Sequence, residues 1–97
     1  MCGIHGFTWS DQAQIERMVE LSHKRGPDAN SSYKDIHISL GHNLLAITEN
    51  PNVSTQPWEM YDKNVLCYNG EIYNYKELKE EIENKYQHKF QTDSDTE

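Results

Sequence analysis

The sequence lacks any long apolar run. No stretch of eighteen apolar residues occurs in the 97 residues, and no basic segment followed by an apolar one opens the chain. These absences argue against a membrane-spanning helix and a secretory signal peptide. Hydrophobic residues make up 35% of the chain and charged residues 26%, which is the polar end of the globular range. We therefore expect one small, cytoplasmic folding unit with a modest core.

Basic residues are also scarce. Nine Lys and Arg face sixteen Asp and Glu, so the formal net charge is -7, and the basic residues are scattered along the chain. Such a surface repels a phosphate backbone and offers no basic stripe to bind one. Nucleic acid and membranes are therefore not expected as partners.

Metal-binding patterns are missing as well. The chain has two cysteines, Cys2 and Cys67, and neither belongs to a Cys-x-x-Cys motif. The five histidines show no spacing typical of a zinc site, so no metal is predicted. Without a secretory signal, both thiols are expected to be reduced.

The N-terminus carries the first candidate for chemistry. If Met1 is removed, Cys2 becomes the first residue, with a thiol and a free α-amino group on one residue. Reference pKa values of about 7.7 to 8.0 for the amine and about 8.5 for the thiol let the amine take the thiol proton near neutral pH. The alternative is that Cys2 packs as a small hydrophobic residue, so this interpretation needs support from elsewhere in the chain.

The first third of the chain predicts a strand and a helix. Residues 3–9 resemble a short buried strand interrupted by two glycines. Asp11 and Gln14 have the spacing of a capping box, which predicts a helix that begins here and ends near Lys24. Gly26 and Pro27 cannot continue that helix.

The middle of the chain predicts mainly strands. Apolar and polar residues alternate over 36–40, which is typical of a half-buried strand, and 44–47 and 65–68 are short apolar runs. Residues 50–56 are polar and predict a surface loop. Asn69-Gly70, directly after the third run, is typical of a hairpin turn.

The last third predicts a second helix. Asn74 and Glu77 have the capping spacing, and apolar residues then recur at helical intervals as far as Tyr86. The charged residues between Lys76 and Lys85 lie on the opposite, solvated face. Residues 90–92 are a candidate for the start of another strand.

Four stretches together carry a family resemblance: Met1-Cys2-Gly3-Ile4, Arg25-Gly26-Pro27-Asp28, Tyr68-Asn69-Gly70-Glu71-Ile72-Tyr73-Asn74 and Ser94-Asp95-Thr96-Glu97. In this order they resemble the glutaminase domain of class II glutamine amidotransferases, in the asparagine synthetase branch. The resemblance implies an α+β fold, the N-terminal portion of a four-layer αββα N-terminal-nucleophile hydrolase sandwich with antiparallel sheets. Residues 1–97 would form only the first part of that domain, without a synthetase domain.

The resemblance also implies roles for individual residues. Cys2 would be the nucleophile once Met1 is removed, and Asn69 and Gly70 would form the oxyanion hole. Arg25 and Asp28 would support the loop beside the nucleophile, although an exposed ion pair between them is the alternative. The implied glutamine-binding residues are Leu45, Ile47, Thr48, Asn69, Gly70, Glu71 and Asp95.

One position departs from the family pattern. The family usually has an arginine that binds the α-carboxylate of glutamine, and Leu44 stands in its place. Losing a charge-assisted hydrogen bond costs about 1.5 to 3 kcal/mol unless another cation reaches the site. Either another element binds the carboxylate, or glutamine affinity is low, or the substrate differs.

The resemblance predicts glutamine hydrolysis to glutamate and ammonia, with the ammonia used for ATP-dependent amidation of aspartate. Amidation of a sugar uronic acid during polysaccharide synthesis is an alternative acceptor reaction. A non-catalytic interaction module is a third possibility, consistent with Leu44. No cofactor is expected in this chain, whereas ATP and Mg²⁺ are expected in the synthetase domain. The expected partners are L-glutamine and a synthetase domain or subunit, and exposed apolar sheet surface would favour self-association.

Overall fold

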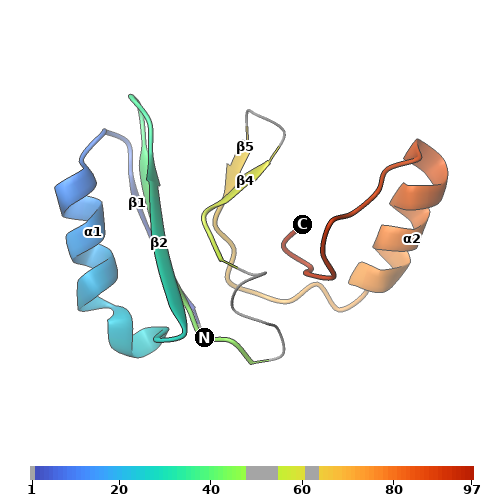
Figure 1. Ribbon diagram of the computed structural model, residues 1–97, viewed down its shortest axis with the longest axis horizontal. Helices are drawn as coiled ribbons and strands as arrows, with labels where there is room; N and C mark the ends of the chain where they lie inside the picture. The colour runs from blue at the N-terminus through green and yellow to red at the C-terminus, as the bar shows by residue number, and fades with distance from the viewer. Residues whose placement is uncertain (1, 48–54, 61–63) are drawn as a thin grey trace.

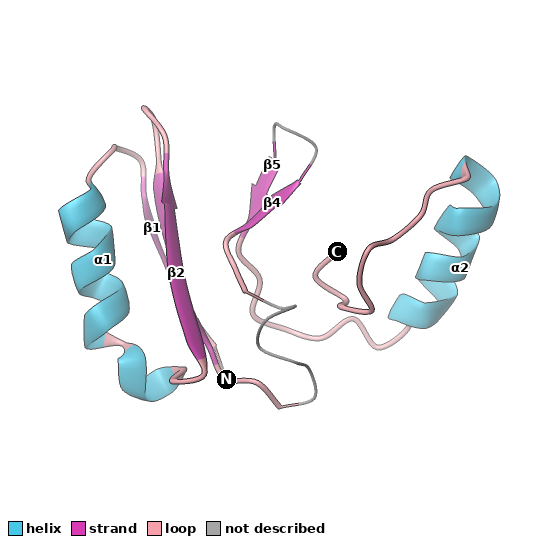
Figure 2. Cartoon of the chain, viewed as in Figure 1, coloured by secondary structure: helices cyan, strands magenta, loops and turns pink. Residues whose placement is uncertain are grey.

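A computed structural model describes residues 2–47, 55–60 and 64–97. These described residues contain two α-helices, one short 3-10 helix and five strands, coloured by type in Figure 2. Their bounds are β1 (Gly3–Phe7), α1 (Gln12–Leu21), η1 (His23–Arg25), β2 (Ala29–Lys34), β3 (Ser39–Leu44), β4 (Trp58–Met60), β5 (Asn64–Leu66) and α2 (Tyr75–Tyr86).

The strands form two antiparallel sheets. The first sheet has the strand order β1-β3-β2. Asn43 of β3 lies opposite Gly3 of β1 on one side and opposite Asn30 of β2 on the other, so β3 is paired along both edges. The second sheet is the hairpin β4-β5, in which Trp58 lies opposite Leu66. The predicted α+β class with antiparallel sheets is therefore confirmed.

Helix α1 begins where the sequence predicts. The backbone N–H of Gln14 donates to the Asp11 side chain at 2.9 Å, which satisfies one of the unpaired amides of the first turn. The α-helix ends at Leu21, and the 3-10 turn η1 carries the chain on to Arg25. The predicted end near Lys24 thus falls within this tighter turn.

Helix α1 packs on one face of the first sheet. A Cβ atom built on Gly41 would lie 2.5 Å from Val19 Cγ2, so the absent side chain lets the helix approach β3 closely. Asn43 Nδ2 donates to the Val19 carbonyl at 3.0 Å from the same face. Ile15, Val19 and Leu44 are the buried hydrophobic residues of the described chain.

The opposite face of this sheet is called the inner face here. Because side chains alternate along a strand, Leu40, His42 and Leu44 point away from α1 and onto the inner face. Ile4 lies opposite His42 in the register and shares that face. The inner face thus carries both the buried Leu44 and a buried histidine.

The remaining elements lie on the inner-face side of the sheet. In Figure 1, α1, the first sheet, the β4-β5 hairpin and α2 follow one another across the view, and the C-terminal segment lies between the hairpin and α2. The molecule is elongated, with extents of 43 × 30 × 18 Å. Neither α1 nor α2 is long and apolar enough to cross a membrane.

The strand predicted over residues 36–40 is confirmed only for Ser39 and Leu40, which open β3, and is wrong for residues 36–38. Asp35 accepts hydrogen bonds from the amides of His37 at 2.7 Å and Ile38 at 2.9 Å, and this turn places Ile36 in solvent with 82% of its surface exposed. The actual strands lie on either side of the turn, in β2 and β3. Of the strand predicted over 44–47, only Leu44 is confirmed, because β3 ends at this residue.

Later predictions are confirmed only in part. Strand β5 ends at Leu66, and Asn69-Gly70 leads on to α2 rather than turning a hairpin. Helix α2 follows Asn74 as predicted, but the Asn74 side chain makes no capping hydrogen bond, and no residue of α2 is buried. Residues 90–92 are not a strand, β4 was not predicted, and most of the predicted loop over 50–56 lies outside the described residues.

Candidate functional site

Cys2 lies just before β1 and is held from two sides. Its carbonyl oxygen accepts a hydrogen bond from Arg25 Nε at 3.0 Å, and its thiol lies 4.0 Å from the carbonyl oxygen of Leu45. Gly3 lies opposite Asn43, so continuing the β1–β3 pairing by one residue places Cys2 opposite Leu44. Cys2 is therefore on the same side of the sheet as Leu44, which is the inner face. The half-buried thiol is therefore fixed at one end of the sheet.

The loop from Arg25 to Asp28 is bound to the end of β3. The Asp28 amide donates to the Leu44 carbonyl at 3.0 Å, and Asp28 Oδ2 accepts from the Ala46 amide at 2.7 Å. A Cβ atom on Gly26 would lie 2.5 Å from the carbonyl oxygen of Asn43, so only glycine fits this close approach. Arg25 and Asp28 bind backbone groups here and form no ion pair with each other in the described chain.

A second group of candidates lies in the stretch after β5. The Tyr68 amide donates to Gln56 Oε1 at 2.5 Å, and buried Gln56 donates in turn to Thr96 Oγ1 at 3.3 Å. At the other end, the Ile72 amide donates to Asp95 Oδ2 at 2.8 Å. The tripeptide from Asn69 to Glu71 is therefore anchored on both sides.

Within this tripeptide, hydrogen-bond donors remain available. Asn69 and Gly70 are exposed, and in the described part of the chain neither the Asn69 side chain nor the Gly70 amide has a hydrogen-bond partner. A Cβ atom on Gly70 would lie 2.8 Å from Tyr68 Oη, so the tyrosine ring folds against this glycine. Such a fixed pair of unpaired donors can stabilise a negatively charged oxygen.

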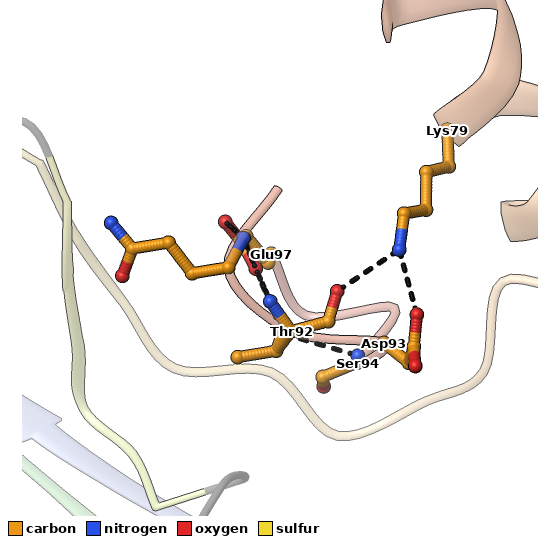
Figure 3. A network of polar contacts seen from close by, with 6 residues as sticks. Lys79, Thr92, Asp93, Ser94 and Glu97 are labelled. Atoms are coloured by element: carbon orange, nitrogen blue, oxygen red, sulfur yellow. Dashed lines mark hydrogen bonds and ion pairs between the residues drawn. The ribbon is translucent and has the colours of Figure 1, made fainter. Parts of the chain in front are cut away.

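The C-terminal motif is folded around Glu97 (Figure 3). Its carboxylate accepts hydrogen bonds from the amides of Gln91 and Thr92 and from the Thr92 hydroxyl. Burial alone raises the pKa of Glu97, but these hydrogen bonds outweigh it and lower the pKa overall. Lys79 of α2 donates to the Thr92 carbonyl at 3.2 Å and to Asp93 at 2.7 Å, which fixes the segment that carries Asp95.

His42 is a buried residue of the inner face that was missed from the sequence. It is 1% exposed, and its Nε2 has no hydrogen-bond partner among the residues that the structure describes. Burial lowers the pKa of His42, so the imidazole is neutral at pH 7. The only available signal was its position between Leu40 and Leu44 in an alternating strand.

The other residues predicted at the glutamine site differ in how far they are exposed. Leu45 is half-buried beside the Cys2 thiol, whereas Ile47 is 79% exposed. Thr48 lies outside the described residues. Leu44 is 6% exposed, so its side chain is part of the core rather than a polar wall.

The second cysteine, Cys67, has low nucleophilic reactivity. Burial raises the pKa of Cys67 to about 11, so it is a neutral thiol at physiological pH. In the described residues, no three His, Cys, Asp or Glu side chains are grouped so that they could hold a metal ion.

Comparison with known families identifies the class of protein. The glutamine amidotransferase domain family matches residues 1–97. The chain therefore belongs to this family, in agreement with the resemblance of its four motifs.

Individual relatives show which branch of the family the chain resembles. The chain is 38% identical over 106 residues to asparagine synthetase [glutamine-hydrolyzing] 1 of Bacillus subtilis, covering 100% of this chain and 16% of that protein. It is 40% identical over 104 residues to asparagine synthetase [glutamine-hydrolyzing] 1 of Arabidopsis thaliana, covering 100% of this chain and 17% of the relative. An Oryza sativa asparagine synthetase [glutamine-hydrolyzing] is 42% identical over 106 residues, again covering 100% of this chain and 17% of the relative. The chain thus spans about a sixth of these relatives, and no solved structure was found to match it.

Proposed function

We propose that this chain is the N-terminal part of a glutaminase domain that hydrolyses glutamine to glutamate and ammonia through Cys2. The observation that carries the proposal is a Cys2 thiol held at the end of the first sheet together with an Asn69–Gly70 pair that is anchored at Tyr68 and Ile72 and has unpaired donors among the described residues. A thiol and two unpaired donors are the groups that amide hydrolysis by an acyl-enzyme route requires.

The chemistry follows from these groups. The α-amino group of Cys2 takes the thiol proton, and the sulfur attacks the carboxamide carbon of glutamine. Asn69 Nδ2 and the Gly70 amide donate to the resulting oxyanion, each contributing about 3 to 4 kcal/mol. Collapse of the tetrahedral intermediate passes a proton to the leaving nitrogen and releases ammonia. Water then cleaves the glutamyl thioester to glutamate and the free thiol.

Substrate binding uses the anchored acidic residues. Glu71 and Asp95 bind the α-ammonium of glutamine, and Asp95 is already oriented by its hydrogen bond from Ile72. Backbone groups at Leu45 and Ile47 complete the proposed binding site. Leu44 supplies no cation for the α-carboxylate, so a weak affinity for glutamine is expected.

The wider assembly is proposed by likeness. The order of α1, the first sheet, the β4-β5 hairpin and α2 is compatible with the start of a four-layer αββα sandwich (Figure 1). Residues 1–97 form the first part of the amidotransferase domain. The ammonia passes to a synthetase domain or subunit that uses ATP and Mg²⁺. The names of the relatives favour aspartate over a uronic acid as the acceptor.

A non-catalytic interaction module is the second candidate. The buried Leu44 favours it, because it removes the carboxylate partner from the proposed pocket. A module of this kind would keep the fold and its surface but release no ammonia.

Ammonia release from glutamine tests the proposal. The wild-type chain should release ammonia, Cys2→Ala should abolish the release, and Cys67→Ala, the matched control, should retain it. Ammonia release by Cys2→Ala would disprove the nucleophile. A wild-type chain that releases none would favour the interaction module.

A further inference from the structure

Gln56 joins two segments of the proposed site that are far apart in the sequence. Its Oε1 accepts a hydrogen bond from the Tyr68 amide at 2.5 Å, and its Nε2 donates to Thr96 Oγ1 at 3.3 Å. Tyr68 begins the stretch that carries Glu71, and Thr96 directly follows Asp95. Gln56 is 4% exposed, although the sequence predicted a surface loop over residues 50–56.

The two contacts of Gln56 require a primary amide. A backbone N–H can only donate, so the carbonyl oxygen of Gln56 faces Tyr68 and its amide nitrogen faces the hydroxyl of Thr96. A methionine of similar length would make neither contact, and a glutamate would bury a charge without supplying a donor. The side chain is therefore matched to both partners.

A further hydrogen bond ties the other end of the Tyr68 stretch to the same C-terminal segment. The Ile72 amide donates to Asp95 Oδ2 at 2.8 Å. This amide belongs to the peptide bond between Glu71 and Ile72, so the Asp95 carboxylate contacts the backbone beside Glu71. Residues 68–72 are thus attached at both ends to residues 95–96, and at the Tyr68 end the attachment runs through Gln56.

The C-terminal segment is itself well anchored. The Thr96 amide donates to Ser94 Oγ at 3.2 Å, and both residues are 8% exposed. Lys79 of α2 holds the preceding residue, Asp93, at 2.7 Å (Figure 3). Gln56 consequently connects the Tyr68 amide to a fixed part of the structure.

We infer that Gln56 is a positioning residue that fixes the backbone of Glu71 relative to the Asp95 carboxylate. The two acidic residues are thereby held at the separation at which both bind one cation, the α-ammonium of glutamine. The inference rests on the proposed glutaminase function and adds to it a residue that does not touch the substrate. Gln56 acts on substrate binding rather than on the chemical step.

Steady-state kinetics separate positioning from packing. Thr96→Val removes the acceptor for Gln56 at nearly constant volume, Thr96→Ser keeps it as the matched control, and Gln56→Met breaks both contacts. Thr96→Val should raise KM for glutamine about threefold to tenfold with kcat within about twofold of wild type, because the lost interaction acts on binding. Gln56→Met should raise KM at least as far, and Thr96→Ser should stay within about twofold.

A double variant tests whether Gln56 acts through Thr96. Once Gln56→Met has broken the link, adding Thr96→Val should raise KM no further, whereas independent residues would give additive effects on the free energy of binding. A merely structural role would lower the active fraction, and hence kcat, without changing KM. Unchanged KM, additive effects or an equal rise in Thr96→Ser would overturn the inference.

Hydrogen exchange provides a readout that does not depend on activity. Gln56→Met should speed exchange of the Ile72 amide about tenfold relative to the amides of β3, which serve as the internal reference for global stability. Thr96→Ser should leave the Ile72 amide unchanged. An Ile72 amide that does not respond to Gln56→Met would contradict the inference. If the wild type hydrolyses no glutamine but Ile72 responds as expected, the proposed function fails while the positioning of the Glu71 backbone by Gln56 stands.

Discussion

The two cysteines differ in their surroundings, and the difference is testable by alkylation. Cys67 is half-buried, and burial raises its pKa to about 11, well above the ordinary value of a thiol. Each unit lowers the thiolate fraction about tenfold at a pH below both values, so iodoacetamide should modify Cys67 about 100-fold more slowly than an unperturbed thiol.

Peptide mapping after brief alkylation at pH 8 measures this directly. We expect Cys2 to be modified first and Cys67 only slowly, with Cys67 gaining reactivity as the pH rises toward 11. Denatured protein is the control, because both thiols should then react at similar rates. Rapid modification of Cys67 in the native chain would contradict its burial.

At the level of single residues, the sequence indicated most of the candidate site, because four motifs contain Cys2, Arg25, Asn69 and Asp95. It did not indicate His42, whose burial on the inner face depends on segments that are distant in the chain. A contact between distant segments leaves no local pattern, so a buried histidine in a strand resembles any other inward residue.

Helices and strands differed in how well they could be predicted. The start of α1 was confirmed because Asp11, Gln14 and the apolar spacing all favour the same structure. The strand over 36–40 was wrong for residues 36–38, because these residues form a turn that Asp35 stabilises before β3 begins at Ser39. Strand β2 was missed because Ala29–Lys34 is mostly polar and is specified by pairing with β3.

The two helix N-termini lead to a matched prediction. Asp11 accepts a hydrogen bond from Gln14, whereas the Asn74 side chain makes no capping bond. Asp11→Ala should therefore lower the free energy of unfolding by about 1 kcal/mol, and Asn74→Ala by a few tenths at most. Urea denaturation followed by circular dichroism measures both. Equal losses would show that the Asp11 cap contributes nothing specific.

Across the whole molecule, burial is concentrated in the first half. The buried hydrophobic residues of the described chain belong to α1 and β3, whereas α2 has none, and its Leu78 and Ile82 are 39% and 36% exposed. The α+β class followed from the family resemblance, but this uneven burial did not, because it depends on which apolar faces are covered.

Hydrogen exchange should reproduce this division. Amides of β3 should exchange slowest, because both of its edges are paired and α1 covers one face. Amides of α2 should exchange much faster, since little burial opposes its opening. Equal protection of β3 and α2 would indicate that another surface, such as a second copy of the chain, covers α2.

We would first test whether Cys2 is an N-terminal nucleophile. The measurement is the intact mass of the purified chain before and after treatment with a diazoketone analogue of glutamine. We expect a chain without Met1 that gains one adduct, located on Cys2 and suppressed by excess glutamine. A chain that retains Met1, or one that loses Met1 and forms no adduct on Cys2, would contradict it.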